Sequence, residues 1–177
     1  FFEDGTLRPE FMGRLEKILN KADELNMVVI LGLFYFGQDQ NLRDENAIKN
    51  GVRNAVDWLF DKGYRNVLIE VNNECNIKQY DHEILKPGRV HELIDMVKRM
   101  NKKGYRYLVS TSYGGGFVPL PNVVRASDFI LIHGNGVKTY EAMQTLIDNT
   151  RKVEGYRKMP VVVNEDEHFD FEKEKNN

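Results

Sequence analysis

The sequence predicts an α/β fold built on parallel strands, and three observations support this prediction. Short segments rich in valine and isoleucine alternate with amphipathic helical segments along the chain. The short segments are continuous apolar runs, which is typical of parallel strands buried on both faces. Polar and aromatic loops follow the strands, and parallel folds place their ligand sites at these loops. Five such strands fit either an open doubly wound sheet or part of a barrel.

The composition is that of one soluble globular domain spanning residues 1–177. Hydrophobic residues make up 41% of the chain and charged residues 29%, and the net charge is −2. A nucleic-acid partner is not expected, because a protein of that class carries a basic face. A membrane partner is not expected either, because no apolar run approaches the roughly 20 residues that span a bilayer. The sequence predicts no particular oligomeric state.

Hydrophobic periodicity places the elements of the first half of the chain. Apolar residues at helical spacing predict a helix over residues 9–25, and the apolar run 27–34 predicts the first strand. A second helix is expected over residues 44–62, because Gly63 is a typical stop signal. The second strand is predicted over residues 67–71.

The second half continues the alternation of helix and strand. Pro119 and Pro121 disfavour a helix in the segment that precedes the fourth strand. The elements expected here are a helix over residues 90–100, a strand over 107–111, a strand over 129–133, a helix over 139–151 and a strand over 161–163.

Two of the predicted strands end in an Asn-Glu pair. Asn73-Glu74 follows the second strand, and Asn164-Glu165 follows the fifth. The carboxyl ends of parallel strands meet at the same edge of a sheet, so we expect the two carboxylates to lie close together. Such a pair can cleave a glycosidic bond, since one carboxyl protonates the leaving oxygen and the other attacks the sugar or activates water.

These residues resemble the clan A glycoside hydrolases, which are (β/α)8-barrel enzymes, and most of all family 5-like cellulases, mannanases and their relatives. Glu70-Val71-Asn72-Asn73-Glu74 fits the clan's Glu-x-x-Asn-Glu motif at the end of the fourth barrel strand, and the segment from Pro160 to Glu165 fits the Pro-Val-x-x-x-Glu motif at the end of the seventh. The resemblance implies a (β/α)8 TIM barrel. Because a complete barrel takes about 250 residues, we expect an incomplete fragment from helix 2 to strand 7, truncated at both ends.

The resemblance implies a retaining glycoside hydrolase that acts on β-linked polysaccharides or oligosaccharides without a cofactor. Glu74 is the expected acid/base, and Glu165 is the expected nucleophile, with Glu167 as the alternative. Retention requires the two carboxyls to lie about 5–5.5 Å apart. The family also suggests a secreted or periplasmic protein, although the chain shows no signal peptide.

Five residues are candidate contacts to the carbohydrate substrate. Asn73 is expected to bond the sugar 2-hydroxyl, and His133 lies at the end of a strand near the nucleophile. The other three, Tyr35, Tyr113 and Asn135, follow strands in loops, where an aromatic face can stack on a sugar ring or an amide can bond a hydroxyl. Glu70 alternates to the same side as the catalytic residues and is expected to act as their charge partner.

Two other functions remain open at this point. One is a carbohydrate-binding protein without turnover. The other is a metal-dependent hydrolase that uses His133 with the acidic segment Glu165-Asp166-Glu167-His168. Acidic runs are more often solvated, so no metal is expected. Cys75, the single cysteine, is interpreted as a packing residue, because a neighbouring carboxylate disfavours the thiolate.

Overall fold

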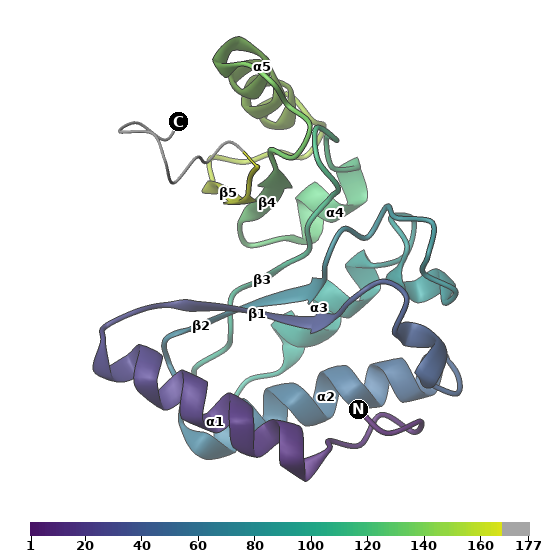
Figure 1. Ribbon diagram of the computed structural model, residues 1–177, viewed down its shortest axis with the longest axis vertical. Coiled ribbons are helices and arrows are strands. Elements are labelled where there is room, and N and C mark those ends of the chain that lie inside the picture. Colours follow the sequence, from purple (N-terminus) through teal and green to yellow (C-terminus); the bar gives the residue numbers. More distant parts are fainter. Residues whose placement is uncertain (168–177) are drawn as a thin grey trace.

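The structure is a computed structural model that describes residues 1–167, and its strands alternate with helices along the chain (Figure 1). Its strands are β1 (Val29–Phe34), β2 (Val67–Asn72), β3 (Val109–Ser110), β4 (Ile130–His133) and β5 (Val161–Glu165). Its α-helices are α1 (Pro9–Glu24), α2 (Glu45–Lys62), α3 (His91–Arg99), α4 (Pro121–Ala126) and α5 (Tyr140–Arg151). Two 3-10 helices, η1 (Asp39–Asn41) and η2 (Glu83–Leu85), lie in the loops after β1 and β2.

The five strands of the described chain form two separate parallel sheets. One sheet has the order β1-β2-β3, and the other pairs β4 with β5. The predicted α/β class with parallel strands is confirmed. The predicted (β/α)8 barrel, expected here as an incomplete fragment, is wrong, because these short strands form no barrel.

The sheet is interrupted after β3, where the chain was expected to continue as a strand to residue 111. Only Val109 and Ser110 pair with β2. Beyond them, the side chain of Thr111 turns its hydroxyl to the carbonyl and side-chain oxygens of Asn72, at 2.7 and 2.9 Å. Closing a barrel requires eight strands in one hydrogen-bonded ladder. The motifs that suggested a barrel indicate only which residues lie at two strand ends, and they do not determine how many strands pair.

A short helix, α4, occupies the segment where the two prolines disfavoured one. Pro121 is its first residue. A proline is tolerated there because its missing N–H has no partner within the first helical turn and its fixed φ suits the helix. The expectation of a non-helical segment is therefore wrong.

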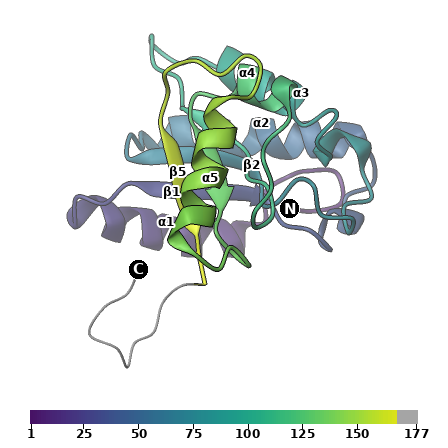
Figure 2. The ribbon, with the colours of Figure 1, turned by 90° about the horizontal axis from the view of Figure 1, so that it is seen from above.

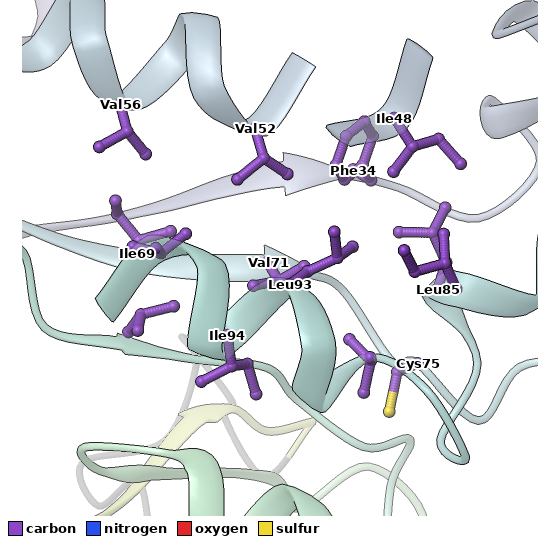
Figure 3. Close-up of a cluster of buried hydrophobic side chains, with 14 of the residues drawn as sticks. Phe34, Ile48, Val52, Val56, Ile69, Val71, Cys75, Leu85, Leu93 and Ile94 are labelled. Carbon is purple, nitrogen blue, oxygen red and sulfur yellow. The ribbon is translucent and has the colours of Figure 1, made fainter. Parts of the chain in front are cut away.

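The main core lies between the three-stranded sheet and helices α2 and α3. Figure 3 shows Val52 and Val56 of α2 pointing toward Ile69 and Val71 of β2, and all four side chains are buried. Burying a valine or isoleucine contributes about 1.5–3 kcal/mol, so this layer fixes β2 and the residues that follow it.

A smaller core supports β4 and β5. Figures 1 and 2 show α5 beside β5, at the end of the molecule away from α1 and α2. The buried members of this cluster are Val124, Ile130, Ile132, Val137 and Leu146. No helix of the described residues is both long and apolar enough to cross a membrane.

Candidate active site

The residue pair Asn73-Glu74 forms a turn directly after β2. Glu74 has a φ of 49°, in the left-handed region that non-glycine residues seldom adopt. Its N–H donates to the Ser112 hydroxyl at 2.8 Å, and the carbonyl of Asn73 accepts from the Tyr80 hydroxyl at 2.6 Å. Non-glycine residues held in this conformation cost about 1–3 kcal/mol and cluster at functional sites.

His133, the last residue of β4, connects the two predicted catalytic glutamates. Its ring is fully buried, and its Nδ1 lies 3.0 Å from Oε1 of Glu74 and 3.6 Å from Oε2 of Glu165. Its Nε2 is buried without a hydrogen-bond partner among the described residues. Since an unpaired buried N–H is costly, the neutral ring carries its proton on Nδ1 and donates it to Glu74.

Glu165 reaches the site from the end of β5. A register shift between Ile132 and His133 places His133 opposite Glu165, and the N–H of Gly134 donates to the Glu165 carbonyl at 2.8 Å. The side chain of Asn135 donates to Oε1 of Glu165 at 2.6 Å. Glu165 is 44% exposed in its side chain and Glu74 13%, so the two carboxylates have different access to solvent.

The two carboxyl groups meet at Nδ1 of His133. One oxygen of Glu74, one oxygen of Glu165 and a ring nitrogen of His133 all lie within 4.8 Å of one another. This proximity is closer to the about 5–5.5 Å between the carboxyls of retaining glycosidases than to the about 6.5–9.5 Å of inverting ones. The arrangement can therefore bring both carboxyls to a single reacting bond.

Glu70 lies beneath this pair, and its side chain is buried. Burial raises the pKa of Glu70, and a hydrogen bond from Ser112 and the nearby His133 counteract part of that rise. Its Oε1 has no hydrogen-bond partner among the described residues. Glu70 thus lies close to the site, and its role as a charge partner of the catalytic residues stays a prediction.

The glycines after β3 pack the two sheets together at the site. A Cβ on Gly115 would lie 2.0 Å from the carbonyl oxygen of Asn135, which no residue other than glycine can accommodate. A Cβ on Gly114 would lie 3.6 Å from Oε1 of Glu74. The N–H of Gly116 donates to the His133 carbonyl at 3.1 Å. The glycines therefore allow close contact between the strand-end loops that carry the site.

The aromatic candidates differ in access. Tyr35 is half-exposed, and its ring stacks on Phe36 with centroids 4.2 Å apart, so one face is held in place and the other is open. Tyr113 is only 3% exposed and accepts a hydrogen bond from the Leu120 N–H, so it has no ring face for a sugar. Cys75 is fully buried, and burial raises the pKa of its thiol to about 12, which fits packing.

The predicted site residues thus fall into three groups. Glu74, His133, Glu165 and Asn135 are joined by direct contacts. Asn73 and Tyr35 lie in strand-end loops of the neighbouring sheet, and the backbone N–H of Asn73 donates to the Phe34 carbonyl. Tyr113 lies in the core. His168 is outside the described residues.

A metal ion is a second candidate occupant, because Glu74, His133 and Glu165 offer three ligands of the two types, carboxylate oxygen and imidazole nitrogen, that suit zinc. Binding a metal at Nδ1 would move the ring proton to Nε2, where it is buried without a partner among the described residues, at a cost of about 1–3 kcal/mol. Glu167 accepts from the Gly136 N–H at 2.8 Å. The buried Nε2 therefore favours a hydrogen bond from His133 to Glu74 over a metal ion at Nδ1.

Sequence reasoning did not identify Ser112, which is buried and binds the N–H of Glu74. Its position after β3, at the same sheet edge as Glu74, was the signal that could have indicated it. No protein-family model matches the chain, no curated protein matches its sequence, and no solved structure matches its fold. The function must therefore be argued from the site.

Proposed function

We propose that this protein is a glycoside hydrolase that cleaves β-glycosidic bonds with retention of configuration. The observation that carries the proposal is the pair of carboxyls, Glu74 and Glu165, which each have one oxygen within 4.8 Å of the other beside His133. The local resemblance to clan A glycoside hydrolases supports the same roles. This resemblance concerns the residues around the two strand ends and does not depend on a barrel architecture.

In the first step, the Glu165 carboxylate attacks the anomeric carbon while Glu74 gives its proton to the departing oxygen. The bond from Glu165 to the sugar forms as the glycosidic bond breaks. Asn135 holds the attacking carboxylate through Oε1, which leaves Oε2 for the sugar. The Nδ1–H of His133 stabilises the negative charge that appears on Glu74 after the proton has left.

In the second step, Glu74 takes a proton from water, and that water displaces Glu165 from the anomeric carbon. Two displacements at the same carbon restore its configuration. Glu74 suits the role of acid and base, because it is the more shielded of the two carboxyls. We propose that Asn73, Asn135 and the open face of Tyr35 contact the sugar.

The test compares Glu74→Gln, Glu165→Gln and the control Glu167→Gln on a panel of fluorogenic β-glycosides and oligosaccharides, with the product anomer read by NMR. Each of the first two substitutions should lower kcat/KM by about 10²–10⁴-fold or more, as expected when a positioned acid or base is lost. The control should retain turnover, and the first product should be the β-anomer.

Three outcomes would contradict this proposal. Sugar binding without turnover would indicate a carbohydrate-binding protein. Turnover abolished by a chelator and restored by zinc would indicate a metal-dependent hydrolase. Loss of activity in Glu167→Gln with full activity in Glu165→Gln would indicate that Glu167 is the nucleophile.

A further inference from the structure

A buried carboxylate, that of Asp39, joins the loop after β1 to the loop after β2. Asp39 is 1% exposed. Its Oδ2 accepts from the backbone N–H of Asp81 at 2.9 Å and of His82 at 3.1 Å, and Nδ1 of His82 lies at 3.0 Å. An aspartate is seldom buried unless its charge is compensated by donors. These contacts, all from one short segment, satisfy Oδ2, whereas Oδ1 has no hydrogen-bond partner among the described residues.

The segment that Asp39 fixes includes Tyr80, the residue before Asp81. Tyr80 is 1% exposed, and the ring of Phe36 packs edge-on against it with centroids 6.4 Å apart. The side chain of Gln40 adds a second link between the loops by donating to the Gln79 carbonyl at 2.9 Å. The Tyr80 hydroxyl therefore has little freedom to move.

The hydroxyl of Tyr80 acts on the peptide group that joins Asn73 to Glu74. The carbonyl of that peptide accepts from Tyr80 at 2.6 Å, and its N–H donates to Ser112 at 2.8 Å. Both polar atoms of one peptide unit are thus fixed by side chains from two different loops. Since φ of Glu74 is in the left-handed region, this peptide needs such support to keep its orientation.

We propose that Asp39 is a positioning residue for Glu74, acting through Tyr80 on the peptide between Asn73 and Glu74. The proposal rests on the acid/base role of Glu74 in its effect on catalysis. Its structural part, the order of the Asn73-Glu74 turn, does not depend on that role. A merely structural tie between two loops would lower stability and leave proton donation by Glu74 intact.

The experiment uses Asp39→Asn, Tyr80→Phe, the double variant and the matched control Asp81→Asn. Asp39→Asn keeps the shape of the side chain and removes its charge. Tyr80→Phe keeps the ring and removes the hydroxyl. Asp81 gives only its backbone N–H to this contact, so its side chain is a control on the same loop.

Two substrates separate positioning from stability. A dinitrophenyl glycoside has a leaving group that needs no proton, whereas an alkyl glycoside or oligosaccharide depends on Glu74. Small misplacements of catalytic groups cost up to about 10²-fold in rate, so we expect Asp39→Asn and Tyr80→Phe to lower kcat on the alkyl glycoside by about tenfold to 10²-fold. Their kcat/KM on the dinitrophenyl substrate, which reports glycosylation and not the later step that also uses Glu74, should change less than about twofold. Residues acting in one chain are not additive, so the double variant should be no slower than the slower single variant.

Amide hydrogen exchange supplies the readout that does not need activity. In Asp39→Asn and Tyr80→Phe, the peptide covering residues 72–77 should exchange faster than in the unmodified protein, and in Asp81→Asn it should not. The proposal is overturned if Asp39→Asn accelerates exchange only around residues 79–82, or if both substrates slow equally. If the unmodified protein cleaves no glycoside, the proposed function fails, and the exchange pattern alone decides whether Asp39 orders the turn.

Discussion

Glu70 is the third carboxyl at a site whose proposed chemistry needs two. Its buried position raises its pKa because the charged form is poorly solvated, and the charges of Glu74 and Glu165 act in the same direction. The protonation of Glu70 is therefore linked to the folding stability of the protein.

The sign of this link predicts how Glu70→Gln behaves. Because the pKa of Glu70 is raised above its ordinary 4.5, its contribution to stability is fully present below pH 4.5 and is lost as the pH rises through the raised value. Glutamine imitates the protonated form and removes this loss. We expect the free energy of unfolding of Glu70→Gln to exceed that of the unmodified protein at pH 8, and we expect this difference to shrink as the pH falls toward 4.

Urea unfolding at several pH values measures this difference. The exposed Glu3→Gln serves as the control, and its difference in free energy of unfolding from the unmodified protein should be the same at every pH. A constant offset between Glu70→Gln and the unmodified protein from pH 4 to pH 8 would show that Glu70 does not titrate differently in the folded state.

The individual site residues differ in how far the sequence could identify them. Glu74, Glu165, His133 and Asn135 all directly follow or end strands, so the alternation of strand and loop was enough to bring them to one edge. Tyr113 also follows a strand, but sequence position does not show which way a ring turns, and packing against Cys75 and Leu120 places it in the core. The side chains of Asp39 and Ser112 bind backbone N–H groups, and such contacts have no recognisable sequence motif.

At the scale of elements, the segment after β3 decides how closely the two sheets approach. It contacts Glu74 at Gly114 and the loop after β4 at Gly115 and Gly116. The absence of side chains lets backbone meet backbone across the gap between the sheets. The sequence motif of three glycines thus serves close approach.

Gly115→Ala tests this role. The added Cβ would lie 2.0 Å from the Asn135 carbonyl, so the two loops must separate. We expect a loss of about 1–3 kcal/mol in the free energy of unfolding. We also expect the proposed glycosidase activity to fall by a larger fraction than the free energy of unfolding does, because Asn135 holds Glu165.

The matched control is Gly13→Ala, in the exposed interior of α1, where nothing lies within 4 Å of the added Cβ. It should stabilise the protein by about 0.5–1 kcal/mol, since alanine is the better helix former. Thermal unfolding of both variants measures the contrast. Equal stabilities for the two alanine variants would contradict the close approach at Gly115.

The positions of the long helices and of four strands agree with their hydrophobic periodicity, because α2 and β2 bury continuous apolar stripes. The short elements did not follow local pattern. β3 pairs with β2 over only two residues, and α4 begins at a proline that local rules treat as a breaker.

At the scale of the whole molecule, the two glutamates that we propose to be catalytic belong to two different packing units. Glu74 follows the three-stranded sheet, which is attached to the larger core, and Glu165 ends β5, whose residues are partly or fully exposed. β5 pairs with β4 and has no second neighbour among the described residues. The site is complete only when the smaller unit is folded against the larger one.

This division predicts that activity is lost before the bulk of the fold. In a urea titration, glycosidase activity should fall at a lower urea concentration than the far-UV circular dichroism signal. Native-state hydrogen exchange should show lower opening free energies for β4 and β5 than for β2. Coincident transitions in both measurements would mean that the two sheets unfold as one cooperative unit.

The barrel is the part of the prediction that failed, and it failed at this scale. Periodicity identifies where strands lie, and strand-end motifs identify which chemistry they carry. Neither specifies how many strands share one hydrogen-bonded ladder, because that number depends on contacts between residues far apart in the sequence.

The left-handed backbone of Glu74 has a consequence for protein engineering. Glycine and asparagine adopt this conformation at little cost, and Oε2 of Glu165 lies 3.6 Å from the same His133 nitrogen that Glu74 binds, so that nitrogen keeps an acceptor nearby. A library randomised at position 74 and selected only for survival of heating should therefore become enriched in these two residues. Selection for thermal stability would then favour glycine or asparagine at position 74, whereas selection for turnover would favour glutamate.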